Sequence, residues 1–328
     1  MNPVADAAEL LDSRLGARLQ HDVALAPRTT YRVGGSAALF VDARSIDDLV
    51  AIAEARQLTG VAVLVVGRGS NMLVADAGFD GIALSVAGCA DGIDLPDFGE
   101  VGGRCIVTAG GGVALPVLAR RTAAAGITGF EWAVGVPGSI GGAVRMNAGG
   151  HGSDMAASLR DVTVFDFDEA ERGPFVRLAN DLGLRFRASS LAASQVVLDV
   201  RLDFGYGDRQ QSERDVAEIV RWRREHQPGG QNCGSVFVNP VPGEVTAGGL
   251  IDELGLRGFR IGTAWVSEKH ANFVQSCDGG TAADVRAVIE AVRDRVAEAT
   301  GYRLRSEVRL VGFDDTDPMS FDDAEAAA

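Results

Sequence analysis

Alternating apolar and polar positions predict a mixture of helices and strands along this chain. Residues 281–299 give the clearest amphipathic helix, which Thr281 and Asp284 begin. One face of this helix carries Val285, Val288, Ile289, Val292 and Val296. A second helix is predicted over residues 45–56, where Ser45 can cap the first turn. Its shared apolar face consists of Ile46, Leu49, Val50 and Ala53.

Two further helices and several strands complete the pattern. Helices are expected over 114–126, ending at a glycine, and over 212–224. VAVLVV at 61–66 is typical of a buried strand and is far too short to span a bilayer. Strands are also favoured over VTVFDF at 162–167 and QVVLDVRLDF at 195–204. The mixture indicates an α+β protein.

Turns and composition suggest where the chain divides. GYGD at 205–208 and the Pro/Gly break at 228–230 bracket a junction near residue 205. Residues 1–22 form an N-terminal extension, for which we expect disorder with a short helix as the alternative. The acidic, small-residue segment 313–328 is also expected to be disordered.

Composition excludes some classes of protein. The formal net charge of −14 argues against a general nucleic-acid or anionic-membrane binder, because phosphate-rich surfaces attract basic proteins. The four cysteines stand far apart, without a nearby histidine cluster, so we expect neither a metal site nor a disulfide framework. The N-terminus is acidic and lacks an apolar leader, so a cytoplasmic protein is expected.

Two glycine-rich loops are candidates for holding a diphosphate. GRGSNMLV at 67–74 follows a predicted strand, and its exposed N–H groups could form an anion-binding nest, although a plain turn is the alternative. GVPGSIGGAVRMNAGGHG at 135–152 is the stronger candidate, because so many glycines are costly to order and argue against a helix or packed strand. A glycine-rich hinge remains the alternative. The candidate cofactor-binding residues are Gly67, Gly69, Ser70, Asn71, Gly135, Pro137, Gly138, Gly141, Gly142, Asn147 and Gly149.

Several sequence blocks resemble known proteins. TYRVGGSAALFV at 30–41, together with the glycine loops, resembles the p-cresol methylhydroxylase-type FAD-binding domain. Four later blocks, in this order, resemble the UDP-N-acetylenolpyruvoylglucosamine reductase family: RFRASSL (185–191), NCGSVFVNP (232–240), AGGLIDELGLRGFRIGTAWVSEKHANFV (247–274) and LRSEVRLVG (304–312). Only 48 positions separate Arg187 from Ser235, so the chain looks like the shorter subclass, which lacks an extra tyrosine-bearing loop.

The resemblance implies a fold, a reaction and its cofactors. It implies an FAD-binding domain over 23–205 and a smaller α+β substrate-binding domain over 206–312. The implied enzyme uses NADPH and non-covalent FAD to reduce the enolpyruvyl ether of a UDP-sugar to UDP-N-acetylmuramate, for peptidoglycan. Asn71 stands where covalently flavinylated relatives place an anchoring histidine. We expect a monomer in which nicotinamide and substrate use one pocket in turn.

The resemblance also implies roles for individual residues. Arg187 would grip the substrate carboxylate with its planar guanidinium. Ser235 would deliver a proton to the enolate carbon. Glu307 would assist while protonated, or by polarising a water, which requires desolvation to raise its pKa. The implied substrate-binding residues are Asn239, Arg223, Arg224, Lys269 and His270; for Lys269 and His270, organising the loop is the alternative.

Two departures and two rival functions remain. Val238 stands where many relatives have a basic residue, which puts one phosphate contact in doubt. Phe186 replaces a tyrosine common before the catalytic arginine, and we expect it to pack. A flavin-dependent oxidase of a sugar or 2-hydroxy acid is the alternative enzyme. A non-catalytic nucleotide-binding module is the alternative outside catalysis.

Overall fold

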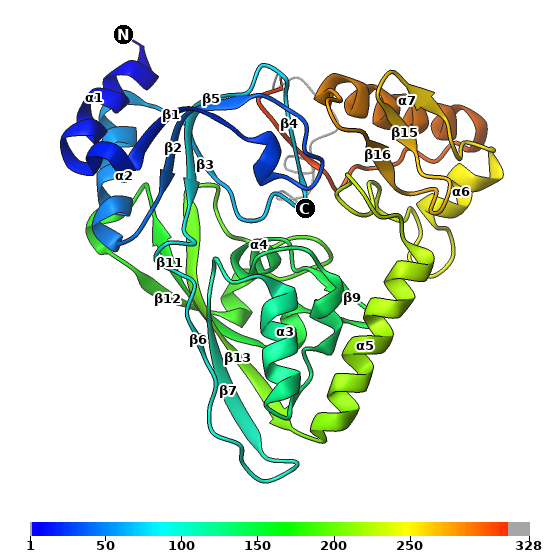
Figure 1. Ribbon diagram of the computed structural model, residues 1–328, viewed down its shortest axis with the longest axis horizontal. Coiled ribbons are helices and arrows are strands. Elements are labelled where there is room, and N and C mark those ends of the chain that lie inside the picture. Colours follow the sequence, from blue (N-terminus) through cyan, green and yellow to red (C-terminus); the bar gives the residue numbers. More distant parts are fainter. Residues whose placement is uncertain (1, 314–328) are drawn as a thin grey trace. The chain divides into compact units, whose positions relative to one another are not determined.

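The computed structural model describes residues 2–313, which form two compact units that are both discontinuous in sequence (Figure 1). The first contains residues 2–21, 39–68 and 81–223, and the second contains 22–38, 69–80 and 224–313. The junction therefore differs from the one expected near residue 205. Helix α5 (Arg209–His226) packs Val216, Ile219 and Val220 against the core of the first unit, which extends that unit to Arg223.

An antiparallel six-stranded sheet dominates the first unit. Its strands run in the order β12 (Phe175–Leu178), β11 (Leu159–Asp166), β13 (Gln195–Tyr206), β7 (Arg104–Gly110) and β6 (Ile93–Asp94), and β8 (Ile127–Thr128) pairs with the end of β13. Helices α3 (Leu115–Ala124) and α4 (Ile140–Arg145) cover one face (Figure 1). Burial of Val107, Val162 and Val200 under these helices forms the main core of this unit.

A second sheet has the order β1 (Leu19–Ala24), β2 (Ser36–Asp42), β5 (Phe79–Ser85) and β3 (Val63–Val65). Strand β3 covers only part of the run predicted at 61–66. Helix α2 (Ile46–Thr59) packs with this sheet and confirms the predicted helix, with the Ser45 Oγ accepting a hydrogen bond from the Asp48 N–H at 3.3 Å. Ile46 is the exception on its predicted face, because it is 36% exposed.

The expected disorder of the N-terminal extension is wrong. Residues Pro3–Leu15 form helix α1, and the Asn2 Oδ1 accepts a hydrogen bond from the Val4 N–H at 3.1 Å. Ala7, Leu11 and Leu15 lie four residues apart, so they share one helical face, and all three are buried with α2 residues in one core. This burial gives the extension the apolar contacts that ordering requires.

The expectation that residues 135–152 exclude helix and strand is also wrong. Helix α4 forms within this segment, with Ser139 as its N-cap. Its Ile140, Ala143 and Val144 have helical spacing and are buried in the core, which offsets the entropic cost of the neighbouring glycines. Two short strands, β9 (Gly149–Gly150) and β10 (Ser153–Asp154), pair as a hairpin.

The second unit is built around helix α7 (Ala282–Thr300). All five residues predicted for its apolar face are buried, which confirms that helix. They pack in one core with the three-stranded sheet β14 (Arg260–Ile261), β15 (Ala264–Val266) and β16 (Val274–Ser276), and with α6 (Ala247–Glu253). Strand β17 (Arg309–Val311) pairs in parallel with β4 (Met72–Val74), which explains why residues 69–80 belong to this unit.

Short 3₁₀ turns connect some of these elements, at Gly16–Arg18, Ala26–Arg28, Glu131–Gly135, Met155–Ala157, Ala170–Arg172 and Ala179–Leu182. Within residues 2–313, none of the helices combines the length and the hydropathy needed to cross a membrane. Of the tail predicted to be disordered, all but Phe313 lies outside the described residues.

Candidate active site

The segment that carries Ser235 is held by backbone hydrogen bonds on two sides. The Val236 N–H donates to the Asn272 carbonyl at 2.9 Å, and the Val238 N–H donates to the Arg305 carbonyl at 3.0 Å. The side chain of buried Asn272 pairs with both backbone groups of Phe237, accepting from its N–H at 2.9 Å and donating to its carbonyl at 2.8 Å. Half-buried Ser235 therefore sits on a fixed backbone.

Glu307 lies beside this loop, between Ser306, which forms an isolated bridge with Phe237, and strand β17. Its N–H donates to the Val236 carbonyl at 2.7 Å, and its own carbonyl accepts from the Asn71 Nδ2 at 2.7 Å. The residue is only 8% exposed. Two of the three predicted catalytic residues thus come together within the second unit, on backbones joined by a direct hydrogen bond.

A buried thiol and a buried phenol lie in the same region. Burial raises the pKa of Cys233 to about 12, and the charge of Glu307 contributes to the rise. Burial also raises the pKa of Tyr31, with the nearby thiol as a second cause. Both groups therefore stay protonated at neutral pH and add no negative charge near Glu307.

Arg187 belongs to the first unit, where it lies against the glycine-rich segment. Its Nη1 donates to the Gly149 carbonyl at 3.4 Å, and its backbone has a positive φ of 56°. Such a conformation is costly for a non-glycine residue and persists where the surroundings impose it. The expected packing of Phe186 is wrong, because its ring is 64% exposed; the Arg187 guanidinium lies 5.2 Å from the ring centre.

The predicted cofactor residues of the first unit lie around α4. A Cβ atom at Gly67 would come within 2.4 Å of the Ser139 Oγ, so only glycine lets the first loop approach the second this closely. Gly141 donates its N–H to the Gly111 carbonyl at 2.8 Å, and Gly142 donates to the Ser139 Oγ at 3.3 Å. Gly138 accepts from the Leu115 N–H, while Pro137 is exposed.

Asn147 and Gly149 hold the segment that leads to Arg187. The buried Asn147 amide donates to Asp154 at 3.1 Å and to the Arg185 carbonyl at 3.2 Å, and it accepts from the Ala156 N–H at 3.0 Å. Gly149 pairs with Asp154 in the β9–β10 hairpin. The Asn147 side chain is thus engaged by the protein, and its contribution to this region is to fix the turn before Arg187.

In the second unit, Gly69, Ser70 and Asn71 form the turn before β4. Gly69 has a φ of 56°, and a Cβ there would lie 2.3 Å from the Arg28 carbonyl oxygen. Among the described residues, none accepts a hydrogen bond from the backbone N–H of these three residues. Consecutive free N–H groups in a turn bind anions, so this donor set fits a phosphate of a nucleotide cofactor.

The predicted substrate-binding residues divide between the units. Arg223, in the first unit, is half-buried beside Gly135, and burial lowers its pKa. In the second unit, the Lys269 Nζ donates to the Arg224 carbonyl. The His270 Nδ1 accepts from the Asn272 N–H at 3.2 Å, and the Asn239 Oδ1 accepts from the Ala247 N–H at 3.1 Å at the start of α6.

Comparisons with known proteins show the family to which this chain belongs. A family model described as UDP-N-acetylenolpyruvoylglucosamine reductase, C-terminal domain, matches residues 226–311, and one described as FAD binding domain matches residues 37–169. UDP-N-acetylenolpyruvoylglucosamine reductase of Heliobacterium modesticaldum is 42% identical over 287 residues, which are 87% of this chain and 88% of that protein. The chain belongs to the UDP-N-acetylenolpyruvoylglucosamine reductase family.

Other members of the family extend the match. The reductase of Synechococcus sp. (strain WH7803) is 38% identical over 303 residues, covering 91% of this chain and 95% of that protein. The crystal structure of UDP-N-acetylenolpyruvylglucosamine reductase from Thermus caldophilus has 31% sequence identity and a TM-score of 0.72, covering 90% of this chain and 99% of that one. The predicted family and its FAD-binding α+β fold are therefore confirmed.

Within this family fold, sequence reasoning missed two groups of residues. Asn272 lies in the SEKHANF block, and its amide pairs with Phe237 as a backbone group would. His151 and Trp222 form an edge-to-face pair with ring centres 5.0 Å apart, and both burial and the charge of Arg223 lower the pKa of His151. The sequence signals for this pair were the tryptophan in WRR (222–224) and the histidine in GGHG (149–152).

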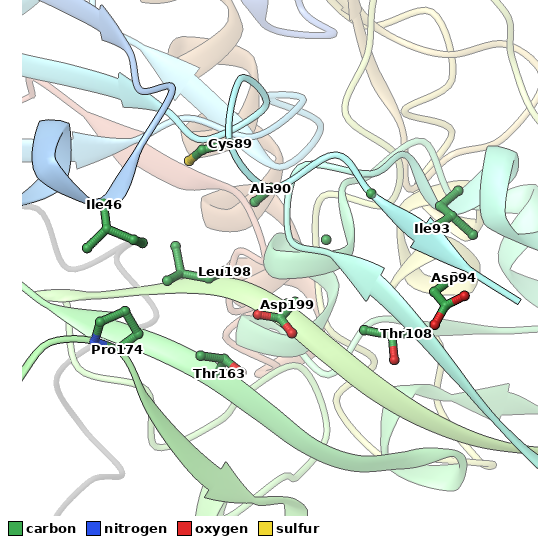
Figure 2. Close-up of a pocket in the computed structure, with 12 residues that line it drawn as sticks. Ile46, Cys89, Ala90, Ile93, Asp94, Thr108, Thr163, Pro174, Leu198 and Asp199 are labelled. Carbon is green, nitrogen blue, oxygen red and sulfur yellow. The ribbon is translucent and has the colours of Figure 1, made fainter.

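A pocket of about 520 Å³ lies on the other face of the six-stranded sheet in this reductase-family fold (Figure 2). Thr108, Thr163 and Asp199 line it, and they alternate along their strands with the core residues that face α3 and α4. Among the described residues that line this pocket, none is a predicted catalytic, cofactor or substrate residue. The pocket is therefore separate from the candidate active site.

Proposed function

We propose that this protein is a reductase of UDP-N-acetyl-3-O-(1-carboxyvinyl)-glucosamine that forms UDP-N-acetylmuramate for peptidoglycan synthesis. NADPH is the reductant, and bound FAD supplies the hydride chemistry. The observation that carries the proposal is the hydrogen bond between the Glu307 N–H and the Val236 carbonyl, which holds Glu307 beside the Ser235 loop in a chain of this family.

Arg187 binds the carboxylate of the enolpyruvyl group. Hydride addition to the methylene carbon places negative charge on the adjacent carbon and on that carboxylate. A guanidinium can make two parallel hydrogen bonds to a carboxylate, and a cation fixed in advance does not have to reorganise as charge develops. The imposed backbone conformation of Arg187 and its contact with Gly149 support this role.

Ser235 donates the proton to the enolate carbon. A hydroxyl is a weak acid in water, but a carbanion-like enolate is a strong base, so transfer over a short distance is feasible. The fixed backbone of residues 236–238 limits the motion of the serine. Glu307, which is almost fully buried, assists as a neutral acid or by polarising a water, because an ionised carboxylate would repel the enolate.

Cofactor and substrate phosphates are bound by two kinds of group. The free N–H groups of Gly69, Ser70 and Asn71 suit a diphosphate of FAD, and glycines 135–149 supply further contacts. Arg223, Arg224 and Lys269 supply positive charge for the UDP end, and Asn239 and His270 supply polar contacts to the substrate. Val238 is aliphatic and buried, so it adds no charge at that end.

The protein is further proposed to act as a monomer in the cytoplasm. Sedimentation velocity at micromolar concentration tests the first point, and fractionation of cells that express the protein tests the second. A dimer at all concentrations would contradict the monomer.

Incubation of the purified, flavin-loaded protein with NADPH and the UDP-enolpyruvyl sugar tests the function. The expected product is the substrate plus two hydrogens by mass spectrometry, with one NADPH oxidised per product. Oxygen consumption with a free sugar or 2-hydroxy acid, without conversion of the UDP-sugar, would instead favour a flavin-dependent oxidase.

A further inference from the structure

The Asn71 side chain links the glycine turn to the backbone of Glu307. Its Nδ2 donates to the Glu307 carbonyl at 2.7 Å, although 236 positions separate the two residues. The backbone carbonyl of Asn71 accepts from the Arg309 N–H at 3.0 Å. The β4–β17 ladder begins there, with Met72 opposite Arg309. Asn71 thus contacts this strand through both its side chain and its backbone.

The side chain takes the place of a backbone donor. In a regular parallel ladder with this register, the Glu307 carbonyl would accept from the backbone N–H of residue 71. The amide side chain makes that bond instead. The backbone N–H of Asn71 donates to no acceptor among residues 2–313, so it stays available with those of Gly69 and Ser70.

Glu307 is consequently held from both sides. Its N–H is bonded to the Ser235 loop through Val236, and its carbonyl is bonded to Asn71. Glu307 is only 8% exposed, so its side chain has little room to compensate for a shift of its backbone. Loss of the hydrogen bond from Asn71 removes one of these two restraints.

We propose that Asn71 is a positioning residue for Glu307, whose amide holds the Glu307 carbonyl while leaving the loop's own N–H groups for an anionic group. This inference rests on the proposed function for the role of Glu307. It predicts that substitution of Asn71 slows hydride transfer from the reduced flavin to the enolpyruvyl substrate more than it slows flavin reduction by NADPH. Only the first of these steps uses Glu307.

Asn71→Ala tests whether the amide of Asn71 holds the Glu307 backbone in place. Hydrogen–deuterium exchange of residues 304–309 in the flavin-free protein should accelerate by about tenfold, the effect of one net hydrogen bond. In the flavin-loaded protein, reoxidation of reduced flavin by the UDP-enolpyruvyl sugar should slow by about tenfold or more, with NADPH-driven reduction largely unchanged. Ser70→Ala, which removes a neighbouring hydroxyl, should leave exchange of 304–309 at the wild-type rate.

Asn71→Asp separates positioning from general damage to the loop. A carboxylate cannot donate to the Glu307 carbonyl, whereas a protonated carboxyl can. The exchange rate of 304–309 in this variant, divided by the wild-type rate at the same pH, should therefore be high at neutral pH and should approach one as the pH falls. A role that merely fills space would give no such pH-dependent rescue.

Two results would overturn the proposal. One is unchanged exchange of 304–309 in both Asn71 variants; the other is an equal loss of flavin reduction and reoxidation, which would assign Asn71 to the flavin itself. Failure of the wild-type protein to transfer reducing equivalents to the UDP-enolpyruvyl sugar would refute the proposed function instead, and the exchange results would still decide the positioning role. If the alanine variant does not fold, the aspartate variant at two pH values provides the same decision.

Discussion

The role proposed for Ser235 gives a chemically ordinary side chain a specific task that depends on its surroundings. The loop around it is fixed by Asn272 on one side and by residues 305–307 on the other. The neighbouring thiol and phenol are held protonated by burial. Ser235 itself is half-buried and directly precedes Val236, whose carbonyl accepts from the Glu307 N–H.

Ser235→Ala is expected to lower turnover of the UDP-enolpyruvyl sugar by about 10²–10⁴, the usual contribution of one general acid. Flavin reduction by NADPH should be spared, because that step needs no proton from Ser235. Rapid-mixing measurement of the two half-reactions distinguishes these effects. Normal reoxidation in this variant would refute the assignment; Ser13→Ala, on the exposed surface of α1, serves as the matched control.

His270 gives a pH dependence of stability. Burial and the charge of Arg257 lower its pKa below the ordinary 6.5, and its Nδ1 must be unprotonated to accept from the Asn272 N–H. Protonation therefore favours the unfolded chain, where the pKa is ordinary, and stability should fall as the pH drops below about 6.5 toward the folded-state pKa. Urea unfolding at pH 7.5 and 5.5 should show a smaller pH effect for His270→Gln than for the wild type; equal effects would contradict this role.

At the scale of elements, helix α1 tests whether the N-terminal segment belongs to the fold. Leu11 is fully buried in the core shared with α2, whereas its neighbour Leu10 is 39% exposed. Leu11→Ala should lower the free energy of unfolding by about 2–5 kcal/mol, the range for large-to-small changes in a core. Leu10→Ala should have a much smaller effect. Denaturant titration of both variants measures the difference, and equal effects would mean that α1 does not pack as described.

Local pattern predicted most elements but few contacts of the site. Helices α2 and α7 were predictable because their apolar residues repeat with helical spacing and begin at capping residues. Helix α4 was missed because glycine content argued against order, while the burial of Ile140 that offsets it depends on tertiary packing. Similarly, Ser235 and Glu307 could be named from sequence blocks, but the Asn71 bond to Glu307 joins residues 236 positions apart.

At the scale of the whole molecule, the chain passes between two compact units several times. Residues 22–38 and 69–80 belong to the second unit because Tyr31 and Val33 pack in its core and β4 pairs with β17. Ser235, Glu307 and Asn71 are thereby parts of one unit, while Arg187 and the segment 135–152 are parts of the other. The proposed chemistry assigns roles to residues of both units.

The most direct test of this account is an anaerobic single-turnover measurement. The flavin of the purified protein is reduced with one equivalent of NADPH, and the UDP-enolpyruvyl sugar is then added while the flavin absorbance is followed. The account predicts rapid reoxidation with formation of UDP-N-acetylmuramate in equal amount. A flavin that stays reduced after addition of the sugar, and reoxidises only when oxygen is admitted, would contradict it.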